Sequence, residues 1–600
     1  PNAVTETIDE NGEVVRAIDK DVLMQEISCT VVDGNEERYQ FTWPDKKKSV
    51  LLANAPINKT LRPCREESVD FDTTENLYIE GDNLEVLKLL QETYLGKIKL
   101  IYIDPPYNTG NDFVYEDDFA QSTDEYLANS GQFDEDGNRM VQNTESNGRF
   151  HTDWLNMIYP RIKLAKDLLS DDGVIFISID DTEQDNLKKI CDEIFGLSNF
   201  IADIIWKRKR GRDNSARWFS KAHEYCLVYA KSKEMFNMGY LKLDEETRKA
   251  YKNPDNDPRG DYRMLGCWAR GTQGGVKYDF TTKDGQYFKE RLWLFSKENL
   301  VKLDKEDKLI VRGDNIYRKM FIYENKGKTP ETLWDDVSNA ANASDEIKKI
   351  FSGIIFETPK PTPYINRMIQ LSTNNDDIIL DFFSGSATTA HAVIEQNFQD
   401  VYDGKLGKRK FIMVQLPELC DEKSEAYKAG YKNICEIGKE RIRRAGKSEY
   451  MSVCSTAGSS LRWDPEKRGK DKNYSCPESV DIGFRVLKLD TSNMKEVYYN
   501  PAEYETSLFS SLEDNIKEDR TPEDLLFQVM LDLGILLSSK IQVRSEKVGM
   551  RSYSYFDVED GYLIACFDKN IDEEVITAIA KQKPYYFVMR DSSMANDSVA

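Results

Sequence analysis

The chain has 600 residues, of which 31% are charged and 40% hydrophobic, and its formal net charge is −23. This length allows several domains with large buried cores, and the acidic balance excludes a surface that is basic everywhere. The ten cysteines include no Cys-x-x-Cys pair and are accompanied by only three histidines, so we expect neither a zinc cluster nor a disulfide framework. The longest apolar stretch, Leu525–Leu537, is too short to span a membrane, and we expect a cytoplasmic protein with no membrane partner.

From Glu75 onward, short apolar runs alternate with amphipathic stretches that have helical spacing. Runs such as "DGVIFISIDD" at 172–181 are continuously apolar between polar ends, which is typical of strands that are buried on both faces. The alternation predicts an α/β fold with a mostly parallel, doubly wound sheet that helices cover on both faces. We expect strands at 76–82, 97–104, 172–181, 200–208 and 223–232, and helices at 83–94, 154–169 and 182–196.

The stretch Trp206–His223, "WKRKRGRDNSARWFSKAH", lies between two of these strands and is strongly basic. It contains seven Lys or Arg residues and one Asp, in a chain whose net charge is −23. A local positive field can attract a nucleic acid even when the global charge is negative. The sequence leaves two interpretations open for this stretch, a nucleic-acid contact and an ordinary solvated loop.

The alternating pattern fades after about Lys233, where Gly, Asp, Lys and aromatic residues mix, and we expect an inserted domain there. The pattern resumes with a strand and a helix in 376–396 and another strand in 408–418. We therefore expect an N-terminal extension, the first half of the sheet domain, the insert, the second half of the sheet domain, and a C-terminal α+β domain, at residues 1–74, 75–232, 233–345, 346–447 and 448–600.

Two of the expected strands end in loops that have the composition of a binding site. The first strand runs into Asp104-Pro105-Pro106-Tyr107, where the prolines end the strand and hold the acid and the aromatic ring in fixed positions. The second runs into "DFFSGS" at 381–386, a small-residue turn that suits a ligand at the backbone, although a simple strand-to-helix connection would look similar. Because ligands of doubly wound sheets bind at the carboxyl ends of the strands, we expect the two loops to hold two reactants side by side.

The tetrapeptide "DPPY", placed before a late "DFFSGS", resembles the motifs of amino-group DNA methyltransferases of the permuted β class. More narrowly, the chain resembles the modification subunits of type III restriction-modification systems from about Glu75 to Gly446, through "ENLYIEGDNLEVLKLL", "IYIDPPYNTG", "GVIFISIDDTE", "HEYCLVYAKS", "TPKPTPYINRMI" and "DFFSGSATTAHAV". The resemblance implies a Rossmann-like methyltransferase sheet with a circularly permuted motif order. It also implies transfer of a methyl group from S-adenosyl-L-methionine to the exocyclic amine of an adenine that is flipped out of double-stranded DNA.

The resemblance assigns roles to individual residues. Asp104, Pro105, Pro106 and Tyr107 are the expected catalytic residues: Asp104 and the Pro105 carbonyl would accept the two N–H bonds of the amine, and Tyr107 would stack on the base. The expected cofactor-binding residues are Asp381, Phe383, Ser384, Gly385, Asp82, Lys360, Pro361 and Gln415.

Two positions depart from the family pattern. Ala387 stands where a second glycine is usual, and Gln415 ends a strand that often ends in an acid, with Glu418 as an alternative nearby. Outside the motifs, we expect His391 and Trp154 to be packing residues.

The resemblance also implies several partners. DNA phosphates, whose contacts set affinity and position but carry no sequence information, are expected to be bound by Arg208, Lys209, Arg210 and Arg212. Base reading is expected to fall to the insert as a target-recognition domain, with Arg270, Gln273 and Arg291 as side chains that suit base edges. We further expect a bacterial homodimer, with the apolar helix near Leu525 as a candidate interface, and a separate restriction subunit that carries the helicase and nuclease.

Several alternatives remain open from the sequence. An RNA or N4-cytosine methyltransferase of the same fold would use similar motifs, although Asp in the first position of the tetrapeptide favours adenine. A protein methyltransferase is a further possibility. An NAD-dependent oxidoreductase would need the full glycine fingerprint that the chain lacks. A catalytically silent DNA-binding scaffold would keep the fold and lose only the chemistry.

Overall fold

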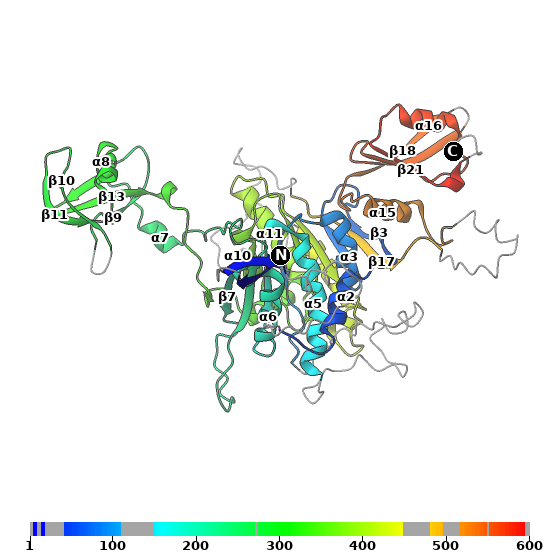
Figure 1. Ribbon diagram of the computed structural model, residues 1–600, viewed down its shortest axis with the longest axis horizontal. Helices are drawn as coiled ribbons and strands as arrows, with labels where there is room; N and C mark the ends of the chain where they lie inside the picture. Colours follow the sequence, from blue (N-terminus) through cyan, green and yellow to red (C-terminus); the bar gives the residue numbers. More distant parts are fainter. Residues whose placement is uncertain are drawn as a thin grey trace. The chain divides into compact units, whose positions relative to one another are not determined.

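The computed structural model describes residues 4–8, 14–18, 41–109, 149–269, 274–447, 480–495, 515–548 and 551–594 (Figure 1). The chain divides into two compact units, of which one is Gly239–Glu331 and the other contains the rest of the chain. Each unit has its own buried apolar core.

The larger unit is built on a ten-stranded sheet. Its strands are β3 Lys59–Val69, β4 Leu77–Glu80, β5 Ile98–Ile103, β6 Leu169–Ile179, β7 Phe200–Trp206, β8 Glu224–Ala230, β14 Leu333–Trp334, β15 Ile378–Asp381, β16 Lys410–Gln415 and β17 Phe484–Thr491. The order is β14-β7-β8-β6-β5-β15-β16-β4-β17-β3, and the antiparallel pairs are β6–β8, β7–β8 and β17–β3. The late strands β15 and β16 lie between the early strands β5 and β4 in the sheet. This arrangement agrees with the circularly permuted order in which the motifs follow one another along the chain.

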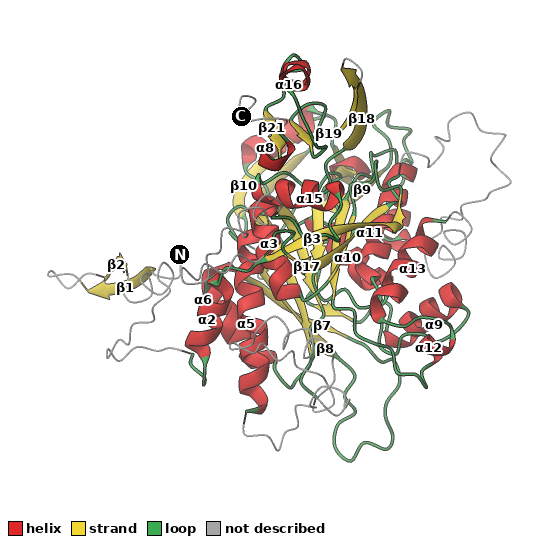
Figure 2. Ribbon diagram, turned by 90° about the vertical axis from the view of Figure 1, so that its right-hand side faces the viewer, coloured by secondary structure: helices red, strands yellow, loops and turns green. Residues whose placement is uncertain are grey.

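The central strands are apolar on both sides because helices cover both faces of the sheet. All six residues of β5 are buried, and β16 carries buried side chains from its second residue onward. Figure 2 shows α5 and α6 on one side of the strands and α11 and α13 on the other, which confirms the doubly wound α/β fold. The first group of helices is α2 Lys46–Asn54, α3 Asn83–Tyr94, α5 Phe150–Leu168 and α6 Gln184–Phe195; the second is α10 Thr362–Ser372, α11 Thr388–Tyr402 and α13 Ile434–Gly446, with α9 Ala340–Phe351 and α12 Glu425–Lys428 beside α13.

The sheet is larger than the alternating pattern predicts. β3 comes from the segment expected to be an N-terminal extension, and β17 comes from the segment expected to be a C-terminal domain. The two strands pair with each other in antiparallel register, and β17 also pairs with β4 in parallel. Pairing between such distant segments leaves no local periodicity, so the sequence pattern does not reveal it.

The helix near Leu525 is not available as a subunit interface. It is α15, Pro522–Asp532, and its apolar side chains Leu525, Leu526, Phe527, Met530 and Leu531 are buried in the core of the larger unit. The expectation of an interface there is wrong because the chain itself already covers these side chains. In the part of the chain that the structure describes, no helix is long and apolar enough to cross a membrane.

The remaining elements of the larger unit form two small sheets. A four-stranded sheet near the C-terminus has the order β18-β19-β20-β21 and is accompanied by one helix. A two-stranded hairpin lies near the N-terminus. The bounds are β18 Ile541–Val548, β19 Arg551–Val558, β20 Leu563–Cys566, α16 Glu573–Ala580, β21 Tyr586–Met589, β1 Val4–Ile8 and β2 Val14–Ile18.

The described residues of the smaller unit, Gly239–Glu331, form two small antiparallel sheets, two α-helices and one 3-10 helix, Ile322–Glu324. Its core is aromatic and centres on the fully buried Trp293. The elements are α7 Glu245–Lys249, β9 Tyr262–Gly266, β10 Val276–Thr281, β11 Tyr287–Trp293, α8 Lys297–Lys305, β12 Leu309–Arg312 and β13 Asn315–Phe321. Of the three residues proposed to read bases, Arg270 and Gln273 lie outside the described residues. Arg291 donates hydrogen bonds to Asn315 Oδ1 and to the Asp314 carbonyl within the unit.

Asp82, which the resemblance assigns to the cofactor, begins helix α3. Its Oδ1 atom accepts hydrogen bonds from the backbone N–H groups of Leu84 and Glu85, at 2.9 and 3.1 Å. Its Oδ2 atom lies 3.1 Å from Nη2 of Arg161, a side chain with no solvent exposure. A carboxylate in this position caps the helix and neutralises a buried cation at the same time.

We therefore predict that Asp82→Ala destabilises the chain by about 2 kcal/mol, because it removes the cap of α3 and one charge-assisted hydrogen bond of the buried Arg161. Urea denaturation of the full chain measures the change. Asp185→Ala is the matched control, because Asp185 also lies in the first turn of a helix and pairs with a lysine, but its side chain is two-thirds exposed. The control should cost less than about 0.5 kcal/mol. Equal losses in the two variants would contradict this role of Asp82.

Candidate active site

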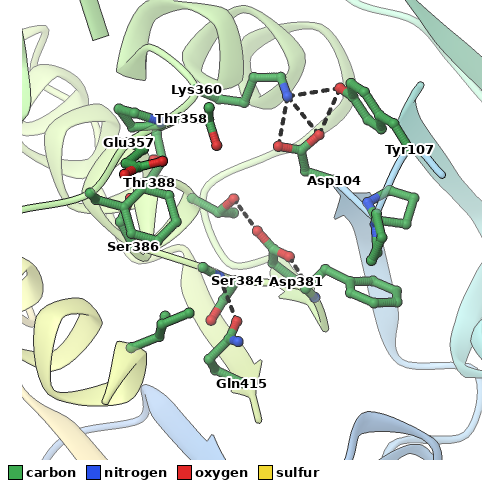
Figure 3. Close-up of a pocket in the computed structure, with 18 of the residues that line it drawn as sticks. Asp104, Tyr107, Glu357, Thr358, Lys360, Asp381, Ser384, Ser386, Thr388 and Gln415 are labelled. Carbon is green, nitrogen blue, oxygen red and sulfur yellow. Dashed lines mark hydrogen bonds and ion pairs between the residues drawn. The ribbon is translucent and has the colours of Figure 1, made fainter. Parts of the chain in front are cut away.

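The two motif loops meet because the strands that precede them are neighbours. β5 and β15 pair in parallel, with Leu380 beside Ile101, so both strands end at the same edge of the sheet. Asp104 follows β5 directly, and Asp381 is the last residue of β15. The two loops line one cavity of about 550 Å³ (Figure 3).

The cavity gathers most of the residues that the sequence singles out. Its lining includes Asp104, Pro105, Pro106, Tyr107, Arg208, Lys360, Asp381, Phe383, Ser384, Gly385 and Gln415, together with Glu418. Two expected cofactor residues are not in the lining: Asp82 caps α3, and Pro361 is the residue before α10. Three expected phosphate contacts, Lys209, Arg210 and Arg212, are exposed in the loop between β7 and β8.

A compact ionic network surrounds the carboxylate of Asp104 (Figure 3). Lys360 Nζ lies 2.6 Å from each Asp104 oxygen and 2.8 Å from the Tyr107 hydroxyl. The Tyr107 hydroxyl in turn donates to Asp104 Oδ1 at 2.9 Å. Burial lowers the pKa of Lys360, but attraction to Asp104 and Glu224 outweighs burial, and the net effect raises it. Lys360 is therefore a cation, and it holds the Asp104 carboxylate in place.

Glu224 completes this network, and the sequence motifs do not include it. It is the first residue of β8 and only 5% exposed. Its carboxylate lies 2.6 Å from Arg208 Nη1, 3.6 Å from Lys360 Nζ and 3.2 Å from the Tyr107 hydroxyl. Arg208 is therefore bound to an internal carboxylate and lines the cavity, in contrast to its expected contact with phosphate. An acidic residue at the start of an otherwise apolar strand, "HEYCLVYA", is the sequence feature that could have indicated Glu224.

Two side chains hold the tetrapeptide 104–107 in place: one comes from α5, and the other is the residue directly after the tetrapeptide. The indole Nε1 of Trp154 donates to the Pro106 carbonyl at 2.7 Å, so this packing residue also positions the loop. Asn108 has a φ of 61° and is fully buried. Its amide donates to Glu183 Oε1 at 2.6 Å and to the Phe150 carbonyl at 3.1 Å. These bonds restrict the conformations open to Asp104 and Tyr107.

The second loop combines a buried acid with a sharp turn. Asp381 is almost fully buried and accepts hydrogen bonds from Thr389 Oγ1 at 2.6 Å and from the Phe383 N–H at 3.1 Å. Burial raises the pKa of the Asp381 carboxyl to about 7, although these two hydrogen bonds oppose the shift. Gln415 Oε1 accepts from the Gly385 N–H at 2.6 Å. Gln415 therefore shapes the turn from the neighbouring strand.

The departure at Ala387 has a clear conformational consequence. Gly385 and Ala387 both have left-handed backbones, with φ values of 49° and 58°. Glycine adopts this region freely, whereas alanine does so at a cost of about 1–2 kcal/mol. Ala387 therefore keeps the backbone that a glycine would favour, and the surrounding structure must hold it there.

Buried polar side chains form hydrogen bonds with the turn after β15 and stabilise it. Asn83 Nδ2 donates to the Phe382 carbonyl at 2.7 Å. Arg441, which is fully buried in α13, donates to the hydroxyls of Ser386 and Thr388 at 2.9 and 2.7 Å. His391 lies beside Arg441, and burial together with this neighbouring cation lowers its pKa well below the usual value. His391 is thus a buried, neutral packing residue.

The chain has close relatives of known class. Residues 98–429 match the family model described as DNA methylase. The Mod subunit of the type III restriction-modification enzyme EcoPI, from Escherichia phage P1, is 33% identical, and the match covers 75% of this chain and 74% of the relative. The StyLTI Mod subunit of Salmonella typhimurium is 39% identical, with coverages of 62% and 57%. The type II methyltransferase M.KpnI of Klebsiella pneumoniae is 32% identical, with coverages of 65% and 92%.

Solved structures with a similar chain path include TTHA0409 from Thermus thermophilus in complex with S-adenosyl-L-methionine, which is 14% identical with a TM-score of 0.28 and covers 62% of this chain and 97% of its own. The PvuII cytosine-N4-specific DNA methyltransferase is also 14% identical, has a TM-score of 0.30, and covers 62% of this chain and 95% of its own. The family model spans more than half of the chain and contains both motif loops. The chain therefore belongs to the DNA methylase family and, within it, to the modification subunits of type III restriction-modification enzymes.

Proposed function

We propose that this DNA methyltransferase uses the cavity between the two strand ends to transfer a methyl group from S-adenosyl-L-methionine to the exocyclic amine of adenine in double-stranded DNA. The observation that carries the proposal is the parallel pairing of β5 and β15, which brings Asp104 and the Asp381–Gly385 turn into one cavity of about 550 Å³. A cavity of this size can hold an adenosyl group and a flat base together.

The turn after β15 is the proposed place for the methyl donor. Ser384 Oγ is buried and has no hydrogen-bond partner among the described residues, so a polar ligand would satisfy it. The left-handed Gly385 lets a ligand approach the backbone closely. Asp381, Phe383 and Glu418 complete this side of the cavity. When bound, the donor supplies an electrophilic methyl group on a sulfonium ion.

Asp104 is proposed to prepare the amine for attack. The nitrogen lone pair of an adenine amine is delocalised into the ring, which makes it a weak nucleophile. If Asp104 and the Pro105 carbonyl each accept one N–H, the nitrogen becomes more tetrahedral and its lone pair is directed at the donor. The fixed carboxylate also stabilises the positive charge that develops on nitrogen, and the amine loses its proton after transfer.

Lys360 is proposed to keep Asp104 oriented until the base arrives. The amine needs one of the Asp104 oxygens that Lys360 now binds. Lys360 can turn toward Glu224, which is 3.6 Å away, so its charge stays paired during this exchange. The aromatic face of Tyr107 is the proposed stacking surface for the flipped base.

Recognition and assembly are proposed from the relatives and from composition. The Gly239–Glu331 unit would read bases, and Lys209, Arg210 and Arg212 would contact phosphates beside the cavity. A separate restriction subunit is the proposed partner, because the relatives are Mod subunits of type III restriction-modification enzymes, and we propose that the chain acts with it as a homodimer.

The deciding experiment incubates the purified chain with DNA and S-adenosyl-L-methionine and identifies the modified bases by sequencing. We expect N6-methyladenine in a defined sequence context. Parallel reactions with RNA and with protein acceptors should show no transfer. Methylation of cytosine, or of RNA alone, would contradict the proposal that adenine in DNA is the methyl acceptor.

We predict that Asp104→Ala lowers kcat by at least about 10³-fold, because it removes the group that orients the amine and stabilises the developing charge. Affinity for the methyl donor should change less than about threefold, and DNA binding should persist. Single-turnover methylation and calorimetric titration measure these quantities. Asp376→Ala is the control, because Asp376 is an exposed acid next to the other end of β15. A variant that methylates as fast as the parent would contradict the proposed role of Asp104, whereas a parent chain that binds DNA and methylates nothing would be a DNA-binding scaffold.

A second prediction follows from the raised pKa of Asp381, about 7. The carboxyl is neutral below this value and ionised above it, and a bound sulfonium favours the ionised form. The dissociation constant for S-adenosyl-L-methionine should therefore fall several-fold from about pH 6 to about pH 8, with release of a proton on binding. Calorimetry in buffers of different ionisation heat measures both effects.

Two controls test this assignment. Asp381→Asn should remove the pH dependence, because the amide does not titrate. S-adenosyl-L-homocysteine, which lacks the sulfonium charge, should show a weaker dependence with the parent chain. An equal dependence for the two ligands would place the titrating group elsewhere.

A further inference from the structure

The basic stretch between β7 and β8 is a loop whose base belongs to the cavity wall. β7 pairs with β8 in antiparallel register, and β8 does so with β6, so the loop leaves the sheet at the edge where β6 and β5 end. Arg208 and Glu224, the residues at its two ends, both line the cavity. Above them, the Lys209 N–H donates to the Ala222 carbonyl at 3.2 Å and closes the neck of the loop. Figure 1 shows the loop projecting beyond β7 and away from the sheet.

Two large aromatic side chains are exposed on this loop. Trp218 is 81% exposed and Phe219 is 95% exposed. Adjacent aromatic residues held in water are unfavourable in a free protein, and such a patch usually marks a binding surface. Neither side chain belongs to the apolar core of the described part of the larger unit.

The loop is held in a defined shape. Asp213 Oδ1 accepts hydrogen bonds from the Ser215 N–H at 2.9 Å and from its hydroxyl at 2.6 Å. The Asp213 N–H donates to Ser220 Oγ at 2.7 Å and joins the two sides of the loop. Lys221 forms an ion pair with Asp181, which follows β6, at 2.9 Å. These contacts hold the aromatic pair in a restricted position on a loop whose two ends, Arg208 and Glu224, line the cavity.

The surroundings of the aromatic pair indicate the chemistry of its partner. The Arg217 guanidinium lies 5.0 Å from the centre of the Trp218 ring. Arg210 and Arg212 are exposed in the same loop, and the stretch Trp206–His223 has seven cations and one acid on a chain with a net charge of −23. Flat rings among cations suit a polymer of stacked bases that carries phosphates. A base that enters the cavity leaves a gap in the DNA stack, and apolar side chains are known to enter such steps.

We propose that Trp218 and Phe219 form a wedge that enters the DNA duplex beside the target and occupies the space left by the flipped base. The cations of the loop hold the phosphates on either side of the wedge. This inference rests on the proposed function, because it presupposes that an adenine leaves the duplex to reach Asp104. It assigns a separate step, extrusion of the base, to residues that do not touch the reacting atoms.

The test compares two DNA substrates with the same recognition sequence. In one, the target adenine is paired with thymine; in the other, it faces an abasic site and needs no unpairing. The double variant Trp218→Ala/Phe219→Ala should lose at least about tenfold in kcat/KM on the paired substrate. On the unpaired substrate it should stay within about twofold of the parent. With 2-aminopurine at the target position, the fluorescence increase that reports extrusion should be lost with the variant.

Controls separate a wedge from other roles of the loop. Tyr585→Ala removes an exposed aromatic residue just before β21 and should leave kcat/KM unchanged on both substrates. Arg217→Ala should weaken both substrates to the same extent and reduce the salt dependence of binding. Thermal unfolding should be the same for the parent and the double variant, because the altered side chains make few contacts.

Three outcomes would overturn the wedge: equal loss on both substrates, no loss on either, or a change of oligomeric state in the double variant. The last would make the aromatic pair a contact between protein copies. If the parent chain methylates adenine in neither substrate, the failure lies with the proposed function itself.

Discussion

The structure depends on the parallel pairing of β5 with β15. These strands come from opposite ends of the methylase region, and their buried apolar side chains allow both to lie at the centre of the sheet. Because the strands are parallel, with Leu380 beside Ile101, each presents its carboxyl end, with Asp104 or Asp381, at the same edge. The alignment places strand ends and the loops that follow them around the cavity, and the segment 356–360 before α10 and the first residues of α11 complete its walls.

Near the paired strands β5 and β15, the charged side chains that line the cavity form ion pairs. Asp104 and Glu224 face Lys360 and Arg208, so two acids and two cations form a closed group in the lining of the cavity. Asp104, Lys360 and the β7–β8 hairpin that carries Arg208 and Glu224 come from distant segments, so this group joins the early and the late halves of the chain through electrostatics as well as through the sheet. Asp381 has no such cation within hydrogen-bonding distance among the described residues, and burial, with a smaller contribution from the nearby Asp104 charge, raises the pKa of its carboxyl. The two carboxylates at the two strand ends thus have different electrostatic environments, as suits loops that handle different reactants.

Hydrophobic patterns in the sequence were sufficient to predict those helices and strands whose burial shows in the local spacing of apolar residues. The expected helix 83–94 coincides with α3, and the runs at 97–104 and 200–208 contain β5 and β7, because hydrophobic periodicity reflects burial directly. The two motif loops and their meeting at one sheet edge also follow from sequence. β3 and β17 could not be placed in the sheet, since their pairing joins distant segments. Glu224, the cap made by Asp82 and the pairing of Arg208 depend on which side chains meet in three dimensions, and spacing along the chain does not encode this.

The self-contained core of the Gly239–Glu331 unit affects how such a chain can diverge. Trp293 and its neighbours pack among themselves, and the unit joins the rest of the chain at only two covalent points, between β8 and β14. A recombination event that exchanges this unit for another of different sequence would leave the central sheet and its charges intact. A single recombination event could therefore change the role of the Gly239–Glu331 unit, while the catalytic residues of the larger unit stay the same.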